Sequence, residues 1–335
     1  MLPIPQRFDV VIAAGNRRAS RSVLGTNKIM LPVAGAPVIT HVLSAVERAE
    51  CTDRIFVVGD VRQLEQALAN PHSPFQGLRP LHLIEQYHTF YENVWEGFLH
   101  TVPDYDPEAG WHVYMNRPEA DKAALFTSGD IPLATPQEIE AFVAACDLSR
   151  FDYFLGVTSE ARLQPYYPRQ SRPGIRMSYF TLHNLRFRQN NLHLVRPFRL
   201  GNRFYIEKMY EYRYQKEWHN IAKLCWELFG KQRSSWRYVG AFLRLHAARL
   251  LTRYGLAHFR PAQQFFLDLP IVCDLLSELL DTRFTIVNTP YGGCTLDIDN
   301  AEHYAAICAN FTAWLSHQEA LGRELAGNSY GAISA

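Results

Sequence analysis

Short apolar runs alternate with stretches of helical spacing along the first half of the chain, and no other feature constrains the fold as strongly. The first run, residues 8–13 (FDVVIA), is apolar without the alternation of a half-exposed strand. Such a run is typical of a parallel strand that is buried on both faces. Repeated strand–helix units of this kind predict a parallel sheet covered by helices, with right-handed crossovers.

The same criteria divide the chain into elements. The expected strands of the first half are residues 8–13, 54–59, 81–85, 123–128 and 153–158. The helices expected between them are Val38 to Ala49, Val61 to Ala69, Thr89 to His100, and one that begins at Pro136 after Thr135 as its N-cap. The segments expected after residue 160 are short strands at 177–183 and 192–196, helices at 202–230, 234–254 and 261–280, strands at 283–288 and 293–298, and a helix at 301–319.

This pattern predicts a three-layer α/β/α, Rossmann-like domain with a mostly parallel sheet. A mainly helical insertion is expected before the last strand and helix. The expected divisions are an α/β core over residues 1–160, the insertion over 161–280, a return to the core over 281–320 and a frayed tail over 321–335.

Charge is unevenly distributed between these parts. The formal net charge is +1, but residues 151–260 hold 20 Lys and Arg against 6 Asp and Glu. That segment therefore carries +14 and the rest of the chain −13, and the same segment holds 22 of the 43 aromatic residues. The sequence thus predicts an acidic frame with a basic, aromatic block, and it excludes a uniformly basic nucleic-acid coat.

Several common classes are excluded by what the sequence lacks. Six cysteines without a CxxC pair are typical of reduced cytosolic thiols, and the thirteen histidines show no HExxH spacing for a zinc site. The start MLPIPQRF has no apolar segment of a secretory signal. No apolar run reaches the roughly 20 residues of a membrane-spanning helix. We therefore expect a cytoplasmic protein.

Two candidate sites follow strands, where ligands bind in doubly wound sheets. The first is the loop of Ala13, Ala14, Gly15, Asn16, Arg17 and Arg18, which continues through Arg21 to Lys28. Its small residues and cations suit a polyphosphate, although it is neither a Walker loop nor a GxGxxG fingerprint. The alternative is a solvated basic loop.

The second candidate site is the run Ser128 to Leu133, with Asp130 at a strand end. A carboxylate beside a phosphate site is suited to Mg²⁺, whereas an isolated Asp more often caps a turn. Asp297 and Asp299 form a third feature. In a strand they would point to opposite faces, so one could reach the metal and the other could cap the helix that starts near Ala301.

Together these motifs resemble nucleotidyltransferases of the GT-A, MobA-like type. The matching residues are AAG at 13–15, Lys28 with LPVAG at 31–35 and Pro37, GDIPL at 129–133 and DID at 297–299. That family includes molybdenum-cofactor guanylyltransferases, sugar-phosphate nucleotidyltransferases and cytidylyltransferases of isoprenoid and lipid-headgroup pathways. The resemblance covers about residues 8–158 and 283–319.

The resemblance implies a Mg²⁺-dependent transfer of a nucleotidyl group from an NTP (CTP, GTP or UTP) to a phosphorylated acceptor, with release of pyrophosphate. The loop from Ala14 to Arg18 would cradle the triphosphate, and Lys28 would offset charge at the α-phosphate. Asp130 would hold the metal, with Asp299 or Asp297 as second ligand. Gln86 and Asn93 lie where the family often contacts the nucleobase.

The chain departs from the family's usual AAGxGxR run at two positions. Arg17 stands at the second glycine and Ala19 at the arginine. Arg17, Arg18 or Arg21 would then supply the missing guanidinium. The departure also motivates an alternative, namely a non-catalytic nucleotide-binding or membrane-docking protein on the same fold.

The basic insertion matches no motif, and four interpretations remain open. It could be an acceptor-binding lid, with the acceptor's phosphate held by Arg172, Arg176, Arg188, Arg196, Arg199 or Arg203. Residues 236–256 could form an interfacial helix on an anionic membrane. The aromatics and cations could bind RNA, which the absence of a named motif disfavours, or the aromatics could simply pack a helical core. Nothing in the sequence indicates an oligomeric state.

Overall fold

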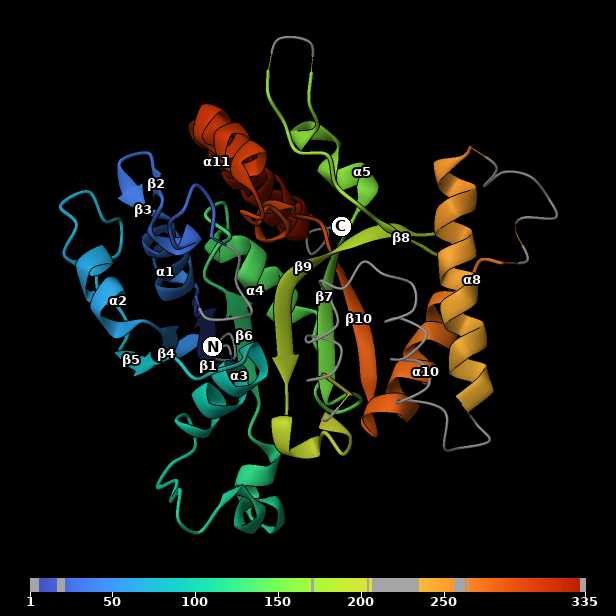
Figure 1. Ribbon diagram of the computed structural model, residues 1–335, viewed down its shortest axis with the longest axis horizontal. Helices are drawn as coiled ribbons and strands as arrows, with labels where there is room; N and C mark the ends of the chain where they lie inside the picture. The colour runs from blue at the N-terminus through green and yellow to red at the C-terminus, as the bar shows by residue number, and fades with distance from the viewer. Residues whose placement is uncertain are drawn as a thin grey trace.

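The computed structural model of the chain describes residues 6–16, 22–169, 172–203, 205–206, 235–255, 263 and 265–331. These residues form one open sheet with helices on both of its faces (Figure 1). The predicted three-layer α/β/α, Rossmann-like class is therefore confirmed.

Eight strands of the described residues make up the main sheet. They are β1 (Phe8–Ala14), β4 (Thr52–Gly59), β5 (Leu81–Glu85), β6 (Ala124–Ser128), β7 (Tyr153–Ser159), β8 (Phe180–Thr181), β9 (Arg186–Val195) and β10 (Phe284–Thr289). Their order is β10-β7-β9-β6-β1-β4-β5, with β8 paired to β9. Along this path every strand but β9 runs in the same direction, and β9 lies antiparallel between β6 and β7 (Figure 1).

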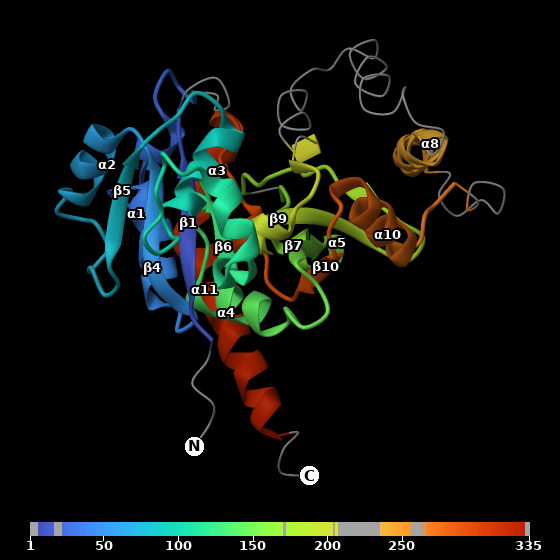
Figure 2. The ribbon, with the colours of Figure 1, turned by 90° about the horizontal axis from the view of Figure 1, so that it is seen from below.

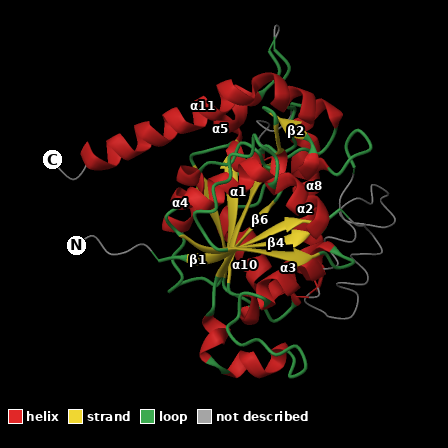
Figure 3. Ribbon diagram, turned by 90° about the vertical axis from the view of Figure 1, so that its left-hand side faces the viewer, coloured by secondary structure: helices red, strands yellow, loops and turns green. Residues whose placement is uncertain are grey.

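The described helices cover both faces. They are α1 (Val38–Arg48), α2 (Val61–Leu68), α3 (Phe90–Leu99), α4 (Pro136–Ala144), α5 (Glu160–Leu163), α8 (Ser235–Arg253), α10 (Leu269–Leu280) and α11 (Ala301–Gly331). Figure 3 shows α1 and α4 on one side of the sheet and α3 and α10 on the other. Thr135 caps α4 as expected, since its hydroxyl accepts from the N–H of Glu138 at 3.3 Å.

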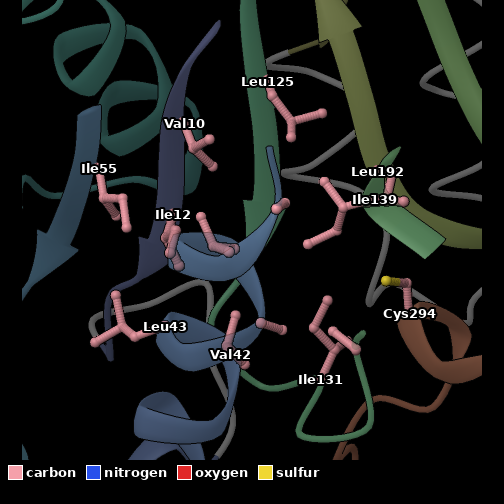
Figure 4. Close-up of a cluster of buried hydrophobic side chains, with 14 of the residues drawn as sticks. Val10, Ile12, Val42, Leu43, Ile55, Leu125, Ile131, Ile139, Leu192 and Cys294 are labelled. Carbon is pink, nitrogen blue, oxygen red and sulfur yellow. The ribbon is translucent and has the colours of Figure 1, made fainter. Parts of the chain in front are cut away.

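The core under α1, α2 and α4 follows from the alternation of side chains along the strands. Val10, Ile12 and Ile55 point to this face and pack against Val42 and Leu43 of α1 (Figure 4). Such residues are fully buried, and each stabilises the fold by roughly 1.5–3 kcal/mol. Helices cover this face completely, so a ligand site on this side of the sheet can form only at the ends of the strands.

The second face is covered in two separate parts. Phe98 and Leu99 of α3 pack on Val11 and Phe56. Further along the same face, α8 and α10 pack against a second cluster around Val157. Figure 2 shows α3 and α10 at separate positions along the sheet. Between these two coverings lies the part of the face that β9 contributes.

A short hairpin connects the first candidate loop to α1. Its strands are β2 (Pro32–Val33) and β3 (Ala36–Pro37), and its two turn residues both have positive φ, 48° at Ala34 and 85° at Gly35. Such a turn has the conformation of a tight two-residue hairpin loop, for which glycine is the favoured residue at the second position. The hairpin accounts for the PVAGAP stretch of the sequence.

Four sequence expectations need correction. The strand expected at 192–196 is the end of the ten-residue β9, which enters the core sheet from the insertion. Residues 293–298 are not a strand but a 3₁₀ turn (Gly293–Thr295) followed by a loop. The helix expected at 261–280 begins at Leu269, and α11 continues to Gly331 through residues expected to be a tail. The helix expected at 202–230 lies mostly outside the described residues.

Candidate functional site

The two candidate loops lie side by side because β1 and β6 are neighbours in the sheet. Ala13 pairs with Ser128 at the carboxyl ends of these parallel strands. The N–H of Gly129 donates to the carbonyl of Ala13 at 2.9 Å and ties the two loops together. Both candidate loops thus lie beyond the carboxyl ends of the strands, where ligands bind in doubly wound sheets.

Gly15 is closely surrounded by the side chains of Gln86 and Asn93. A Cβ atom at Gly15 would lie 2.5 Å from Nδ2 of Asn93 and 3.2 Å from Oε1 of Gln86. Gln86 accepts from the N–H of Asn16 and donates to its side-chain oxygen, both at 2.8 Å. Gln86 and Asn93 were expected near the nucleobase, and the structure places them against the Gly15–Asn16 turn, where Gln86 fixes its path.

Lys28 lies directly opposite Asp130. It begins a short 3₁₀ turn, Lys28–Met30, and its ammonium group pairs with the carboxylate of Asp130. The hydroxyl of Ser128 donates to the second oxygen of the same carboxylate. Both charged side chains are largely buried, with exposed fractions of 14% and 4%. Lys28 and Asp130, which the resemblance assigns to the α-phosphate and the metal, are therefore in contact.

Burial and pairing act in opposite directions on this ion pair. Burial acts to raise the pKa of Asp130, but the Lys28 ammonium and the hydrogen bonds from Lys28 and Ser128 outweigh it, so the pKa is lowered. Burial likewise acts to lower the pKa of Lys28, whereas Asp130 and the more distant Asp297 and Asp299 raise it overall. Both groups are therefore charged at neutral pH.

Asp297 and Asp299 approach the same site from the loop that precedes α11. Nη2 of Arg188, on β9, lies 2.7 Å from Asp297 and 3.7 Å from Asp299. The two carboxylates thus face one guanidinium, and the expectation that they point to opposite faces of a strand is wrong because this segment is a loop. The capping role expected here belongs to Asn300, whose side chain accepts from the N–H of His303 at 2.9 Å.

The carboxylates form a donor set suited to Mg²⁺. Burial, together with the nearby charges of Asp299 and Asp130, raises the pKa of Asp297 despite Arg188, so a bound cation would relieve repulsion at this point. Across the described ranges, no group of three or more His, Cys, Asp or Glu forms a ready-made metal cage. Mg²⁺ is commonly held by one or two carboxylates together with substrate phosphates, and Asp130 with Asp297 fits that description.

Of the six arginines expected to bind an acceptor, the structure brings only Arg188 and Arg203 to the site and the cleft beside it. Arg196 donates to Asp152 at 2.9 Å and Arg199 pairs with Asp121 at 2.8 Å. Both arginines follow β9 at the edge where β6 and β7 begin, opposite the site. Arg172 and Arg176 are exposed, and the segment of Arg172 projects beyond α5 (Figure 1).

Two further expectations concern the loop arginines and the membrane. Arg17 and Arg18 lie outside the described residues. The helix expected at 236–256 is present as α8, with Leu243 and Leu250 exposed on it and Tyr254 exposed just after its end. Contact of α8 with a membrane stays a prediction. None of the helices in the described part of the chain is both long and apolar enough to span a bilayer.

The structure adds site residues that sequence reasoning missed. Trp95 on α3 and His193 on β9 line a cleft that begins at Lys28 and Asp130. Ser128 lay within the second candidate run, but its bond to Asp130 was not expected. The signal for His193 was its position in β9, where every second residue from Gln189 to Val195 lines the cleft.

Comparison with known proteins supports both the fold and the family. A family model for the MobA-like NTP transferase domain matches residues 10–178. No curated protein matches the sequence. A hypothetical transferase from Thermus thermophilus is similar in structure, with a TM-score of 0.53, 20% identity, and coverage of 89% of this chain and 99% of that one.

Two further solved structures are weaker matches. A 4-diphosphocytidyl-2C-methyl-D-erythritol synthase from Anaerococcus prevotii has a TM-score of 0.43 and 12% identity over 92% of this chain and 96% of that one. A cytidylyltransferase from Leptospira borgpetersenii has a TM-score of 0.42 and 11% identity over 96% of each chain. The Thermus structure shows the shared fold, and these two are too distant to add to it.

Proposed function

The chain belongs to the family of MobA-like NTP transferase domains, and from this premise we propose that it is a Mg²⁺-dependent nucleotidyltransferase. It transfers the nucleotidyl group of CTP, GTP or UTP to a phosphorylated acceptor, such as a sugar phosphate, a cofactor phosphate or a lipid-headgroup precursor, and releases pyrophosphate. The observation that supports this best is the buried Lys28–Asp130 pair beside the Gly15–Asn16 turn.

The chain's own residues can position the reactants and offset their charge. The Gly15–Asn16 turn offers close backbone approach to a triphosphate, and Lys28 lies where charge would develop on the leaving pyrophosphate. A phosphomonoester is already largely ionised at neutral pH, so its oxygen needs no general base. That oxygen forms a bond to the α-phosphorus, and the bond from the α-phosphorus to the bridging oxygen breaks, with its electron pair leaving on pyrophosphate.

The residues that would hold Mg²⁺ are Asp130 and Asp297, with Asp299 beside them. When bound, the ion would supply positive charge that stabilises the phosphates in the transition state. Lys28 pairs with Asp130 in this structure and would turn to the triphosphate when Asp130 holds the ion. No other chemistry is required of the site, because phosphoryl transfer depends mainly on positioning and electrostatics.

Pyrophosphate release tests this proposal directly. The protein would be incubated with Mg²⁺, each NTP in turn and a panel of phosphorylated acceptors, while NTP binding is followed by thermal shift. Release that requires one NTP and one acceptor class supports the proposal. Binding of an NTP without release under any pairing would favour the non-catalytic alternative, and absence of both would contradict a nucleotide function.

Substitution of Gly15 tests the nucleotide loop. In Gly15→Ala the new Cβ displaces the amides of Asn93 and Gln86, because it would lie 2.5 Å from the first. We expect NTP affinity to fall about tenfold, the equivalent of one lost hydrogen bond. Titration calorimetry with Mg²⁺ and NTP measures this. Gly240→Ala is the matched control, since nothing lies within 4 Å of that position, and unchanged affinity in Gly15→Ala would contradict the assignment of the loop.

Arg188 is expected to act as a positioning residue for Asp297 and Asp299. Arg188→Gln removes the charge that holds both carboxylates, so we expect kcat to fall about 10–100-fold and half-saturation by Mg²⁺ to require more metal. The Mg²⁺ titration of pyrophosphate release is the measurement. Arg186→Gln is the control on the same strand, because Arg186 pairs with Glu160 instead. An unaltered Mg²⁺ requirement in Arg188→Gln would remove Arg188 from this role.

A further inference from the structure

A largely apolar cleft leads away from the Lys28–Asp130 pair along the sheet. It begins among Gly15, Lys28, Asp130 and Asp297, and it continues between α3 and β9. The apolar and aromatic side chains that line its walls are Phe90, Val94, Trp95, Phe98, Phe126, Tyr153, Val195, Leu200 and Ile206. The reaction centre and this cleft are therefore one continuous space.

The strand register gives the direction and length of the cleft. Gln189 on β9 pairs with Val157 near the carboxyl end of β7, whereas Val195 pairs with Tyr153 at its beginning. Both Gln189 and Val195 line the cleft, and because β9 is irregular between them their partners on β7 are four residue steps apart. At about 3.3 Å per residue the floor is roughly 13 Å long. It extends from the edge that holds the reaction centre toward the opposite edge of the sheet.

The cleft exists because no described helix covers this part of the sheet. α3 packs over β1 and β4, whereas α8 packs on β8 and α10 packs on β10. The antiparallel β9 widens the sheet between these two coverings. An apolar surface that the described helices leave uncovered is typical of a small-molecule site, in which a few polar groups orient the ligand.

The polar side chains that β9 contributes to the cleft floor are engaged with protein partners, whereas the buried hydroxyl of Thr127 has none among the described residues. Nε2 of Gln189 donates to Nε2 of His193 at 2.8 Å, and the hydroxyl of Tyr153 lies 3.0 Å from Nδ1 of His193. The side chain of Asn191 donates to the carbonyl of Cys294 at 2.9 Å. Burial lowers the pKa of His193 to about 4, so the imidazole is neutral. The middle of the cleft thus carries no charge and few hydrogen-bonding groups for a ligand.

The cations lie at defined places around this neutral middle. Lys28 and Arg188 stand at the reaction centre, among the carboxylates. Arg203 lies over the rings of Trp95 and Trp111, with its guanidinium carbon 4.1 and 3.8 Å from their centroids. A guanidinium stacked on indoles presents a weakly hydrated face, so it extends the aromatic wall.

We propose that this cleft binds the body of the acceptor and that the body is a hydrocarbon chain, so that the acceptor is an amphiphilic phosphomonoester. Its phosphate lies at the reaction centre and its chain lies along β9. This step rests on the proposed function for the placement of the phosphate, and it goes beyond it in naming the acceptor class. A sugar body would leave hydroxyl groups unpaired against the apolar wall, at a cost of roughly 1–3 kcal/mol for each buried group.

Binding of alkyl phosphates of increasing length tests the cleft on the full chain. Titration calorimetry would compare n-alkyl phosphates from butyl to decyl, below their micelle concentrations, with glycerol phosphate and glucose 1-phosphate. Each buried methylene should tighten binding about fourfold until the cleft is filled. Equal affinity at all chain lengths, or tighter binding of glucose 1-phosphate, would overturn the proposal.

A cleft-filling variant localises the effect. Val94→Trp places a large side chain in the cleft from α3, so we expect octyl and decyl phosphate to lose at least about tenfold in affinity while butyl phosphate is little changed. Val113→Trp is the matched control, because Val113 is exposed outside the cleft. Equal chain-length dependence in both variants would place the hydrocarbon elsewhere and overturn the proposal, and the unaltered protein's length series stands whether or not Val94→Trp folds.

Thermal shift with Mg²⁺ and each NTP separates this proposal from the one it rests on. NTP binding together with no chain-length dependence would overturn the hydrocarbon acceptor and leave the nucleotidyltransferase intact. Chain-length dependence without any NTP binding would support the cleft and contradict the nucleotide function. We expect NTP binding together with chain-length-dependent binding of alkyl phosphates, and pyrophosphate release only when an alkyl phosphate and the matching NTP are both present.

Discussion

Asp130→Asn is expected to lower the rate of pyrophosphate release by at least about a thousandfold. The buried carboxylate faces Lys28 and lies near Asp297, so it is the residue best placed to hold the metal and the ammonium in one arrangement. Asparagine keeps the shape and one oxygen but loses the charge. The rate would be measured at saturating NTP and acceptor over a range of Mg²⁺ concentrations, and turnover within tenfold of the unaltered protein would contradict the assignment.

The same substitution has a structural consequence that needs its own control. Asparagine leaves the buried ammonium of Lys28 without its partner, and removal of one member of a buried pair typically costs about 3–5 kcal/mol. The double variant Asp130→Asn with Lys28→Met removes both charges, so we expect it to regain much of the stability and stay inactive. Asp53→Asn, at an exposed carboxylate near the start of β4, should leave both stability and activity unchanged. Thermal unfolding of the four proteins distinguishes a folding defect from a catalytic one.

The contact between Lys28 and Asp130 could be predicted in outline from sequence. Both follow apolar strands, and parallel strands bring their carboxyl ends to one edge. Asp297 was expected near them both from the strand pattern at 293–298 and from the family resemblance, but this segment is a 3₁₀ turn followed by a loop. The local sequence alternates like that of a strand. The path of the segment is set instead by a tertiary hydrogen bond, in which the N–H of Ile298 donates to the carbonyl of Asp130 at 3.2 Å.

The place of the antiparallel strand β9 in the sheet, between β6 and β7, could not be predicted from the sequence. Local pattern indicates that a segment is a strand but not which strands it will pair with. β9 joins the sheet between β6 and β7 from a segment that lies after both in the chain. The cleft is built from this insertion together with α3, so no single stretch of sequence contains it. Arg188 and His193 became site residues for the same reason.

The uneven charge also has a structural explanation. Arg196 and Arg199 of the basic segment pair with Asp152 and Asp121, and Arg237 pairs with Glu278. Arg188 pairs with Asp297 in the site. Part of the positive charge of the basic segment is therefore paired with carboxylates of the described residues. Arg188 and Arg203 are the members of the predicted acceptor set that remain beside the cleft.

Glu138 is expected to make the protein less stable as the pH rises from about 4.5 to about 7. It lies in the first turn of α4, fully buried, where one oxygen accepts from the N–H of Cys294 at 2.9 Å and the other has no hydrogen-bond partner. Burial raises its pKa from 4.5 to about 7. The folded chain therefore keeps a proton between pH 4.5 and about 7 that the unfolded chain has released, so the free energy of unfolding falls as the pH rises across this window.

Glu138→Gln tests this directly, because glutamine does not titrate. At pH 5 the variant should match the unaltered protein closely, and at pH 8 it should be more stable by an amount on the order of 3 kcal/mol. Urea unfolding at pH 5, 6, 7 and 8 gives the two curves. Glu65→Gln is the control, since Glu65 is exposed on α2 and its substitution should leave the pH dependence as it is. Parallel curves for Glu138→Gln and the unaltered protein would show that Glu138 is ionised in the fold at no cost and would contradict the prediction.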